Sequence, residues 1–321
     1  MQSVILSLLR ISFSIMQSTK IILLTAAMLF TFQSVVSAQA WLLFNTGNSA
    51  LPDNTVRCVA IDSQNRKWIA TDYGLALYDD INWTIYNSNN SGLPDNNVRT
   101  ITIDTTNVKW IGTQNGGLTR FDDSTWTTWN TANSTLPDNQ VRSIAFDLNG
   151  LIWIGTGGGL TKFNLSKFET YNMFNSLLQS NNITDVFVTN SNQKIVCTLN
   201  GGLTLAMDSV TVVYTLANSG FPDNTLYQAD MDTNGIFWLA SATNGLIAYT
   251  GGTTWVSYNT SNSGITNNSL SSIDCFGNCI YIATIGSGLV VKKGLTFSSF
   301  TTSNSPMASD YLNCVVADSS G

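Results

Sequence analysis

Histidine is absent from the 321 residues, and this absence excludes several kinds of catalytic site. Without histidine there is no Ser–His–Asp triad, no histidine general base and no histidine-containing zinc cluster. Charged side chains are also scarce, at 11% of the chain, with 20 acids against 14 bases. An acidic chain with so few bases lacks the positive surface that nucleic acids require. We therefore expect no nucleic-acid partner, no metal and no cofactor.

Strong helix formers are few as well. Glutamate occurs once, at Glu169, whereas Asn, Ser, Thr, Gly and Trp are abundant. These residues favour strands and turns over helices. The composition predicts an all-β protein.

No apolar run is long enough to span a bilayer, which takes about 20 residues. The run at residues 21–32 follows Lys20 and precedes the small residues 36–38. This arrangement is typical of a secretory signal peptide, which we place at residues 1–38, with Met16 as an alternative start. An uncleaved membrane anchor is the alternative. We expect export to the periplasm, the medium or the cell surface.

An internal repeat dominates the rest of the chain. The motif Leu-Pro-Asp-Asn-x-Val-Arg begins at Leu51, Leu93 and Leu136. Weaker copies begin at Leu178, Phe221, Ile265 and Met307, and successive copies lie 42 to 44 residues apart. A second marker keeps the same register, at Trp68, Trp110, Trp153, Ile195, Trp238 and Tyr281. Two markers in register over six periods identify a repeat protein.

Each period contains four short strand-like segments. In the second copy these are residues 98–104, 109–113, 118–121 and 126–129, separated by Gly, Asn and Asp. Four strands in a repeat of this length are typical of a β-propeller blade. Because the first strand of the unit occurs seven times, we predict a seven-bladed β-propeller at residues 39–321.

The seventh blade is expected to be shared between the chain ends. A fourth-strand segment at residues 41–46 precedes every first strand, and the last first strand begins at Leu312. The N-terminal strand would complete in part the blade begun by Leu312. The sequence stops at Gly321, in the turn after that strand, so we expect a truncated seventh blade and a longer natural protein.

Residues that recur in every unit are expected to serve the scaffold. The tryptophan of the second strand can fill the gap between neighbouring sheets. Acid–arginine pairs four residues apart recur in three copies: Asp53 with Arg57, Asp95 with Arg99, and Asp138 with Arg142. We expect an ion pair in each; a ring of arginines that captures an anion is the alternative.

A ligand is expected at one mouth of the central channel, where two sets of loops emerge on the same face. Candidates are residues there that break the repeat, together with the arginines: Asp72, Tyr73, Gln114, Tyr227, Arg57, Arg99 and Arg142. An aromatic ring beside a carboxylate suits sugar binding.

The five cysteines fit an exported protein. Cys275 and Cys279 bracket a short turn and are candidates for a disulfide. Cys58, Cys197 and Cys314 lie in strand-like patterns and are expected to be small buried residues.

The repeat resembles a known family. The pattern Leu-Pro-Asp-Asn-x-Val-Arg-x-Ile-x-x-Asp, followed by Trp-Ile-Gly-Thr-x-x-Gly-Gly-Leu, occurs at residues 93–121 and, with small changes, at 136–163. It is similar to the two-component regulator propeller repeat. The resemblance implies an extracytoplasmic sensor that detects an oligosaccharide or other extracellular ligand and signals to a kinase beyond a membrane segment. Stand-alone secreted members also occur.

The expected function is therefore an exported, non-catalytic, ligand-binding or sensory propeller. A secreted surface adhesion or scaffold propeller, with a sorting domain in the full-length protein, is the first alternative. A streptogramin-lyase-type enzyme is the second. That activity would need a histidine and a magnesium site, and the sequence contains no histidine.

Overall fold

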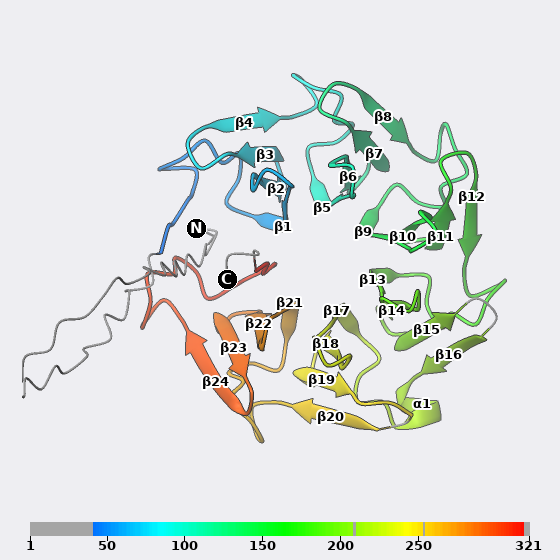
Figure 1. The fold of residues 1–321 in the computed structure, drawn as a ribbon, viewed down its shortest axis with the longest axis vertical. Coiled ribbons are helices and arrows are strands. Elements are labelled where there is room, and N and C mark those ends of the chain that lie inside the picture. Colours follow the sequence, from blue (N-terminus) through cyan, green and yellow to red (C-terminus); the bar gives the residue numbers. More distant parts are fainter. Residues whose placement is uncertain (1–40, 208–209, 253, 318–321) are drawn as a thin grey trace, which may run out of the picture.

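Six four-stranded antiparallel sheets are arranged as blades around a central axis (Figure 1). This computed structural model describes residues 41–207, 210–252 and 254–317. Within each blade the strands follow chain order from the axis to the rim. The predicted all-β propeller with four-stranded blades is therefore confirmed.

The strand bounds repeat from blade to blade. Blades 1 and 2 contain β1 (Val56–Ile61), β2 (Lys67–Thr71), β3 (Gly74–Tyr78), β4 (Trp83–Tyr86), β5 (Val98–Ile103), β6 (Lys109–Thr113), β7 (Leu118–Phe121) and β8 (Trp126–Trp129). Blades 3 and 4 contain β9 (Val141–Phe146), β10 (Ile152–Thr156), β11 (Gly159–Phe163), β12 (Phe168–Tyr171), β13 (Ile183–Val188), β14 (Lys194–Thr198), β15 (Leu203–Met207) and β16 (Val210–Tyr214). A one-turn helix, α1 (Leu216–Ser219), follows. Blades 5 and 6 contain β17 (Leu226–Met231), β18 (Phe237–Ser241), β19 (Leu246–Tyr249), β20 (Trp255–Tyr258), β21 (Leu270–Phe276), β22 (Cys279–Thr284), β23 (Leu289–Lys293) and β24 (Thr296–Phe300).

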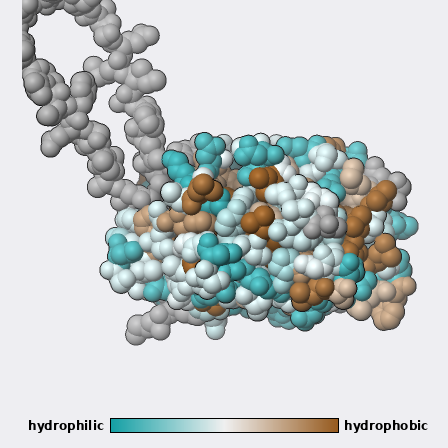
Figure 2. Space-filling view, turned by 90° about the horizontal axis from the view of Figure 1, so that it is seen from below, coloured by the Kyte–Doolittle hydropathy of each residue, from teal (hydrophilic) through white to brown (hydrophobic). Residues whose placement is uncertain are grey.

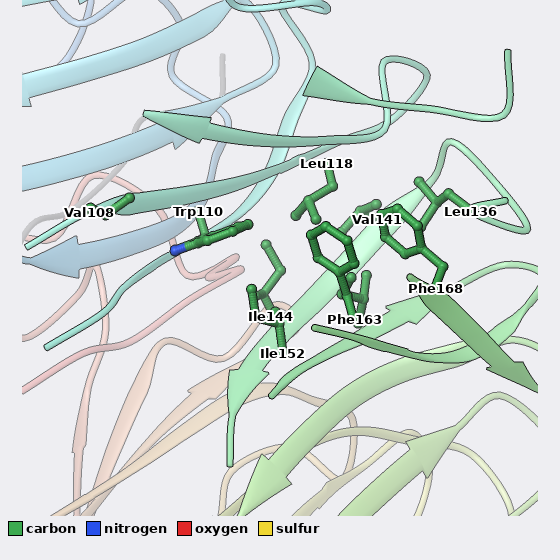
Figure 3. Packing of buried hydrophobic residues seen from close by; sticks show 10 residues of the cluster. Val108, Trp110, Leu118, Leu136, Val141, Ile144, Ile152, Phe163 and Phe168 are labelled. Carbon is green, nitrogen blue, oxygen red and sulfur yellow. The ribbon is translucent and has the colours of Figure 1, made fainter. Parts of the chain in front are cut away.

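Tryptophans of the second strands fill the gaps between blades, as predicted. Trp110 is buried and stacks on Trp129 with ring centroids 5.9 Å apart. Figure 3 shows it on the blade 2 side of a cluster that includes Ile144 and Phe163 of blade 3. Each such indole also donates a hydrogen bond to an aspartate six residues earlier, at 3.0 Å: Trp68 to Asp62, Trp110 to Asp104, Trp153 to Asp147 and Trp238 to Asp232. The repeated tryptophan and aspartate thus belong to the scaffold.

Viewed from the rim, the molecule is a flat disc (Figure 2). The visible surface is mostly hydrophilic, with apolar side chains in separate groups. Among the described residues, no helix is both long and apolar enough to cross a membrane. The predicted signal peptide and its alternative start lie outside the described residues.

The described residues form six four-stranded blades, not seven, so the predicted blade count is wrong. Residues 312–317 lie beside β21, where the Val315 amide donates to Ser272 Oγ at 3.1 Å. They also contact β1, through Asn313 Nδ2 and the Val56 carbonyl at 3.0 Å. However, the described part of the chain supplies no second strand to pair along this segment, and the one isolated bridge, between Tyr311 and Ile285, lies just before it. A sheet needs such a partner, and residues 41–317 therefore contain no seventh sheet.

The predicted N-terminal outer strand is not formed either. Residues 41–46 are irregular, although their aromatic side chains are packed. Phe44 contacts Trp83 of blade 1 with ring centroids 5.3 Å apart, and Trp41 contacts Phe300 of blade 6 at 5.8 Å. Both end segments of the described chain therefore lie in the opening between blades 1 and 6 (Figure 1).

Candidate functional site

A cavity of about 490 Å³ lies at the mouth of the central channel. The second residue of each inner strand faces it: Arg57, Arg99, Arg142, Thr184, Tyr227 and Ser271. The remaining lining residues are Gln140, Leu199, Ile285, Tyr311 and Asn313. The structure thus brings together four of the residues selected from the sequence.

A β-bulge at the start of each inner strand explains why these side chains face the cavity. In β1 the register passes from Val56 to Cys58, so Arg57 has no partner on β2. The same skip occurs in every other inner strand, including β5 at Arg99 and β9 at Arg142. A bulge turns its extra residue away from the regular alternation. Six bulges at one position therefore point six side chains at one mouth.

Arg57 forms an ion pair with Asp72 rather than with Asp53. The Arg57 Nε and Nη2 atoms lie 2.8 and 2.7 Å from the two Asp72 carboxylate oxygens. This hydrogen-bonded pair raises the pKa of Arg57 above its usual value. Asp72 therefore neutralises one of the three arginines, and the predicted pair of Asp53 with Arg57 is wrong.

The other two predicted ion pairs are also absent. Asp95 accepts hydrogen bonds from the backbone amides of Asn97 at 3.1 Å and Asn115 at 2.7 Å. Asp138 accepts from the Gln140 amide at 2.9 Å. These carboxylates thus close Asx turns that hold the loops around the mouth.

Arg99 and Arg142 have no carboxylate within 4.0 Å among the described residues. Arg99 Nε donates to Gln114 Oε1 at 2.6 Å, and Arg142 donates to Gln140 and Asn182. Burial lowers the pKa of both guanidinium groups, and the positive charges of Arg57 and Arg142 lower that of Arg99 further. Both remain cationic at neutral pH. An anion in the cavity would relieve this unbalanced positive charge.

The remaining candidates have different surroundings. Gln114 accepts a hydrogen bond from Arg99, and Asp72 forms an ion pair with Arg57. Tyr227 lines the cavity. Tyr73 is 67% exposed and does not line it. Tyr311, which does, was not among the sequence candidates because it precedes the weakest copy of the inner strand.

Cys275 and Cys279 do not form the predicted disulfide, and both thiols are free. Cys275 lies opposite Ile280, whereas Cys279 lies opposite Phe276. Because side chains alternate along a strand, the two cysteines point to opposite faces of the sheet. Among the described residues there is also no cluster of three or more potential metal ligands from His, Cys, Asp and Glu.

The fold and this cavity define a β-propeller with a ligand-sized mouth, which is lined by two arginines that have no carboxylate partner among the described residues. The sequence profile of the two component regulator propeller matches residues 135–158. The chain therefore carries this repeat, and the resemblance stated from the sequence is confirmed. No curated protein matches the chain in a sequence comparison.

Solved structures share the fold at low identity. The extracellular domain of the hybrid two component system BT3049 from B. thetaiotaomicron has a TM-score of 0.72 at 24% identity, covering 83% of this chain and 37% of that one. The extracellular domain of the one component system BT4673 from the same organism has a TM-score of 0.67 at 18% identity, covering 83% and 38%. Virginiamycin B lyase from Staphylococcus aureus has a TM-score of 0.63 at 13% identity, covering 77% and 84%. The chain spans less than two fifths of the length of the two extracellular domains.

Proposed function

We propose that this chain is the recognition part of an exported, non-catalytic sensory protein and binds an acidic extracellular glycan at the central mouth. The observation that carries the proposal is the pair of guanidinium groups, Arg99 and Arg142, which face a cavity of about 490 Å³ without a carboxylate partner. The likeness to extracellular domains of a hybrid two component system and a one component system supports export and a sensory role.

The chemistry of the mouth suits a sugar that carries a carboxylate or sulfate. Guanidinium groups bind such oxyanions with paired, charge-assisted hydrogen bonds. Tyr227 and Tyr311 offer aromatic faces next to the arginines, against which the apolar face of a sugar ring can pack. The cavity volume lies within the range of small-ligand sites, about 300–1,000 Å³.

A lyase activity is disfavoured by the residues available. Virginiamycin B lyase shares the fold, and a histidine-to-alanine variant of it is described as catalytically inactive. The present sequence contains no histidine. We therefore assign the mouth to binding rather than to catalysis, with signalling or surface attachment supplied by other parts of the full-length protein.

The test is calorimetric titration of the chain with tetragalacturonate, with the neutral maltotetraose as the comparison probe. We expect the acidic probe alone to bind, more weakly as salt is added. Replacing Arg99 and Arg142 by alanine should weaken binding by roughly tenfold or more. Arg120→Ala is the matched control, because Arg120 lies on β7 and is paired with Asp122 at 2.8 Å. Equal binding of both probes, or binding unchanged in the double variant, would refute the proposal.

A further inference from the structure

The packing between blades 3 and 4 lacks an aromatic pair that most blades contain. In four blades an aromatic residue of the third strand stacks on one of the fourth: Tyr78 on Trp83, Phe121 on Trp126, Phe163 on Phe168 and Tyr249 on Trp255, with centroids 3.9 to 4.6 Å apart. In blade 4 the equivalent residues are Ala206 and Thr211, which lie opposite each other on β15 and β16. Blade 6 retains one aromatic residue, Phe297, opposite Lys292. Blade 4 has therefore lost both rings.

A cavity lies where these two rings are missing. Its volume is about 240 Å³. Blade 3 contributes Trp153, Leu160 and Tyr171 to its lining, and blade 4 contributes Val196, Ala206 and Thr211. A cavity of about 150 Å³ is enough for benzene. The space therefore accommodates one six-membered ring with a substituent.

One polar group inside this cavity lacks a partner. In blades 2 and 3 the equivalent threonines bond across the third and fourth strands, Thr119 to Thr128 at 2.9 Å and Thr161 to Thr170 at 3.1 Å. In blade 4, Thr204 lies opposite Val213, whose side chain has no group that can accept or donate a hydrogen bond. Thr204 is 3% exposed, lines the cavity, and its Oγ1 has no hydrogen-bond partner among the described residues. A buried hydroxyl without a partner is costly, so a ligand hydroxyl would gain from pairing with it.

The charges around the cavity favour a neutral ligand. Lys194 Nζ lies 3.5 Å from Asp147 Oδ2 and stands over the Trp153 ring at 5.2 Å. Lys162 Nζ is paired with Glu169 at 2.8 Å. Both ammonium groups that line the cavity are thus already balanced by carboxylates.

We propose that the gap between blades 3 and 4 is a second binding site, which takes a small neutral phenol. The aromatic ring occupies the space of the missing pair, between Leu160 and Ala206, and its hydroxyl pairs with Thr204 Oγ1. The site is separate from the central mouth, because the two share no lining residue.

Titration with 4-fluorophenol and with fluorobenzene, followed by fluorine NMR, tests this site, because the two probes differ only in the hydroxyl. We expect both to bind saturably and 4-fluorophenol to bind more tightly. Thr204→Val should remove that preference while leaving fluorobenzene binding unchanged. Ala206→Phe combined with Thr211→Phe restores the aromatic pair, and it should weaken binding of both probes by roughly tenfold or more.

Two further variants keep the test decisive. Ala206→Leu fills part of the same space and replaces the double variant if that variant does not fold. Arg99 lines the central mouth and not this cavity, so the Arg99→Ala variant should bind 4-fluorophenol as tightly as the unchanged protein does. Absence of saturable binding, or unchanged binding in the cavity-filled variants, would overturn the proposal.

Discussion

Two half-buried aspartates next to the channel predict an unusual dependence of stability on pH. Asp230 on β17 and Asp274 on β21 occupy the same position of neighbouring inner strands. Burial raises the pKa of Asp274 to about 7, and the charge and hydrogen bond of Asp230 raise it too, whereas a hydrogen bond from the Ala317 amide opposes the shift. Burial raises the pKa of Asp230 as well. Two neighbouring carboxyl groups resist the loss of the second proton, because the two negative charges repel each other.

The direction of the effect follows from proton linkage. In the unfolded chain Asp274 loses its proton near 3.8, the ordinary pKa of an aspartate, whereas in the folded protein it holds the proton to a pKa of about 7. Folding is therefore favoured by this group at acid pH, and the benefit is lost as the pH rises between those values. The difference between a pKa of 3.8 and one of about 7 corresponds to at most about 4 kcal/mol of unfolding free energy.

Asp274→Asn removes this titration and keeps an oxygen that accepts from the Ala317 amide. On going from pH 4.5 to pH 8, the unfolding free energy of the variant should rise by about 2–4 kcal/mol relative to that of the unchanged protein. The measurement is urea unfolding at both pH values. Asp79→Asn is the control, because Asp79 is exposed and backbone hydrogen bonds from Asn82 and Ile81 lower its pKa, so it titrates below this range. A parallel pH dependence of the Asp274 variant and the unchanged protein would refute the reasoning.

Three other variants or treatments have defined outcomes. Trp110→Ala should cost ~3–5 kcal/mol of unfolding free energy in urea, because it empties a buried aromatic site between blades 2 and 3. Asp72→Asn should tighten tetragalacturonate binding in calorimetry by about threefold to tenfold, because it leaves the charge of Arg57 unneutralised. Oxidised glutathione should join Cys58 to Cys314, because the two half-buried thiols are neighbours and Cys314 lowers the pKa of Cys58 to about 7. Peptide mapping without reductant should detect the cross-link, and Cys58→Ser should abolish it.

The strands could be predicted because their signals are local and recur. The segments expected at residues 109–113, 118–121 and 126–129 coincide with β6, β7 and β8. Gly, Asn or Asp lies within three residues of each end, and each segment occurs at the same place in the other copies. A large side chain that fills the gap between two sheets recurs at one position of each blade, as tryptophan in four of the six, so its spacing gives the length of a blade.

The partners of the arginines could not be predicted from spacing. Asp53 and Arg57 are four residues apart, which brings side chains together on a helix but separates them by about 13 Å in extended backbone. Asp72 comes next to Arg57 only because β1 pairs with β2, and the bulge at Arg57 then turns its side chain towards the loop after β2. The Leu-Pro-Asp-Asn-x-Val-Arg motif predicts neither the register in which β1 pairs with β2 nor the bulge at Arg57.

The blade count failed for a related reason. Periodicity counts copies of a segment, whereas a blade exists only where a segment finds a hydrogen-bonding partner. Leu312 begins a seventh copy of the inner strand, and its carbonyl accepts from Ser271 Oγ at 2.6 Å. That contact places the segment in the ring but supplies no neighbouring strand.

In a repeat protein, the positions that break the pattern are the most informative about function. A residue that recurs from blade to blade serves the packing that the blades share, as Trp110 and its equivalents Trp68, Trp153 and Trp238 do. Asp72, Tyr227 and the pair of Ala206 and Thr211 each depart from the other copies, and each lies at a cavity or holds a residue that lines one. Because the scaffold does not require these departures, the two cavities are where this propeller can differ chemically from others of its fold.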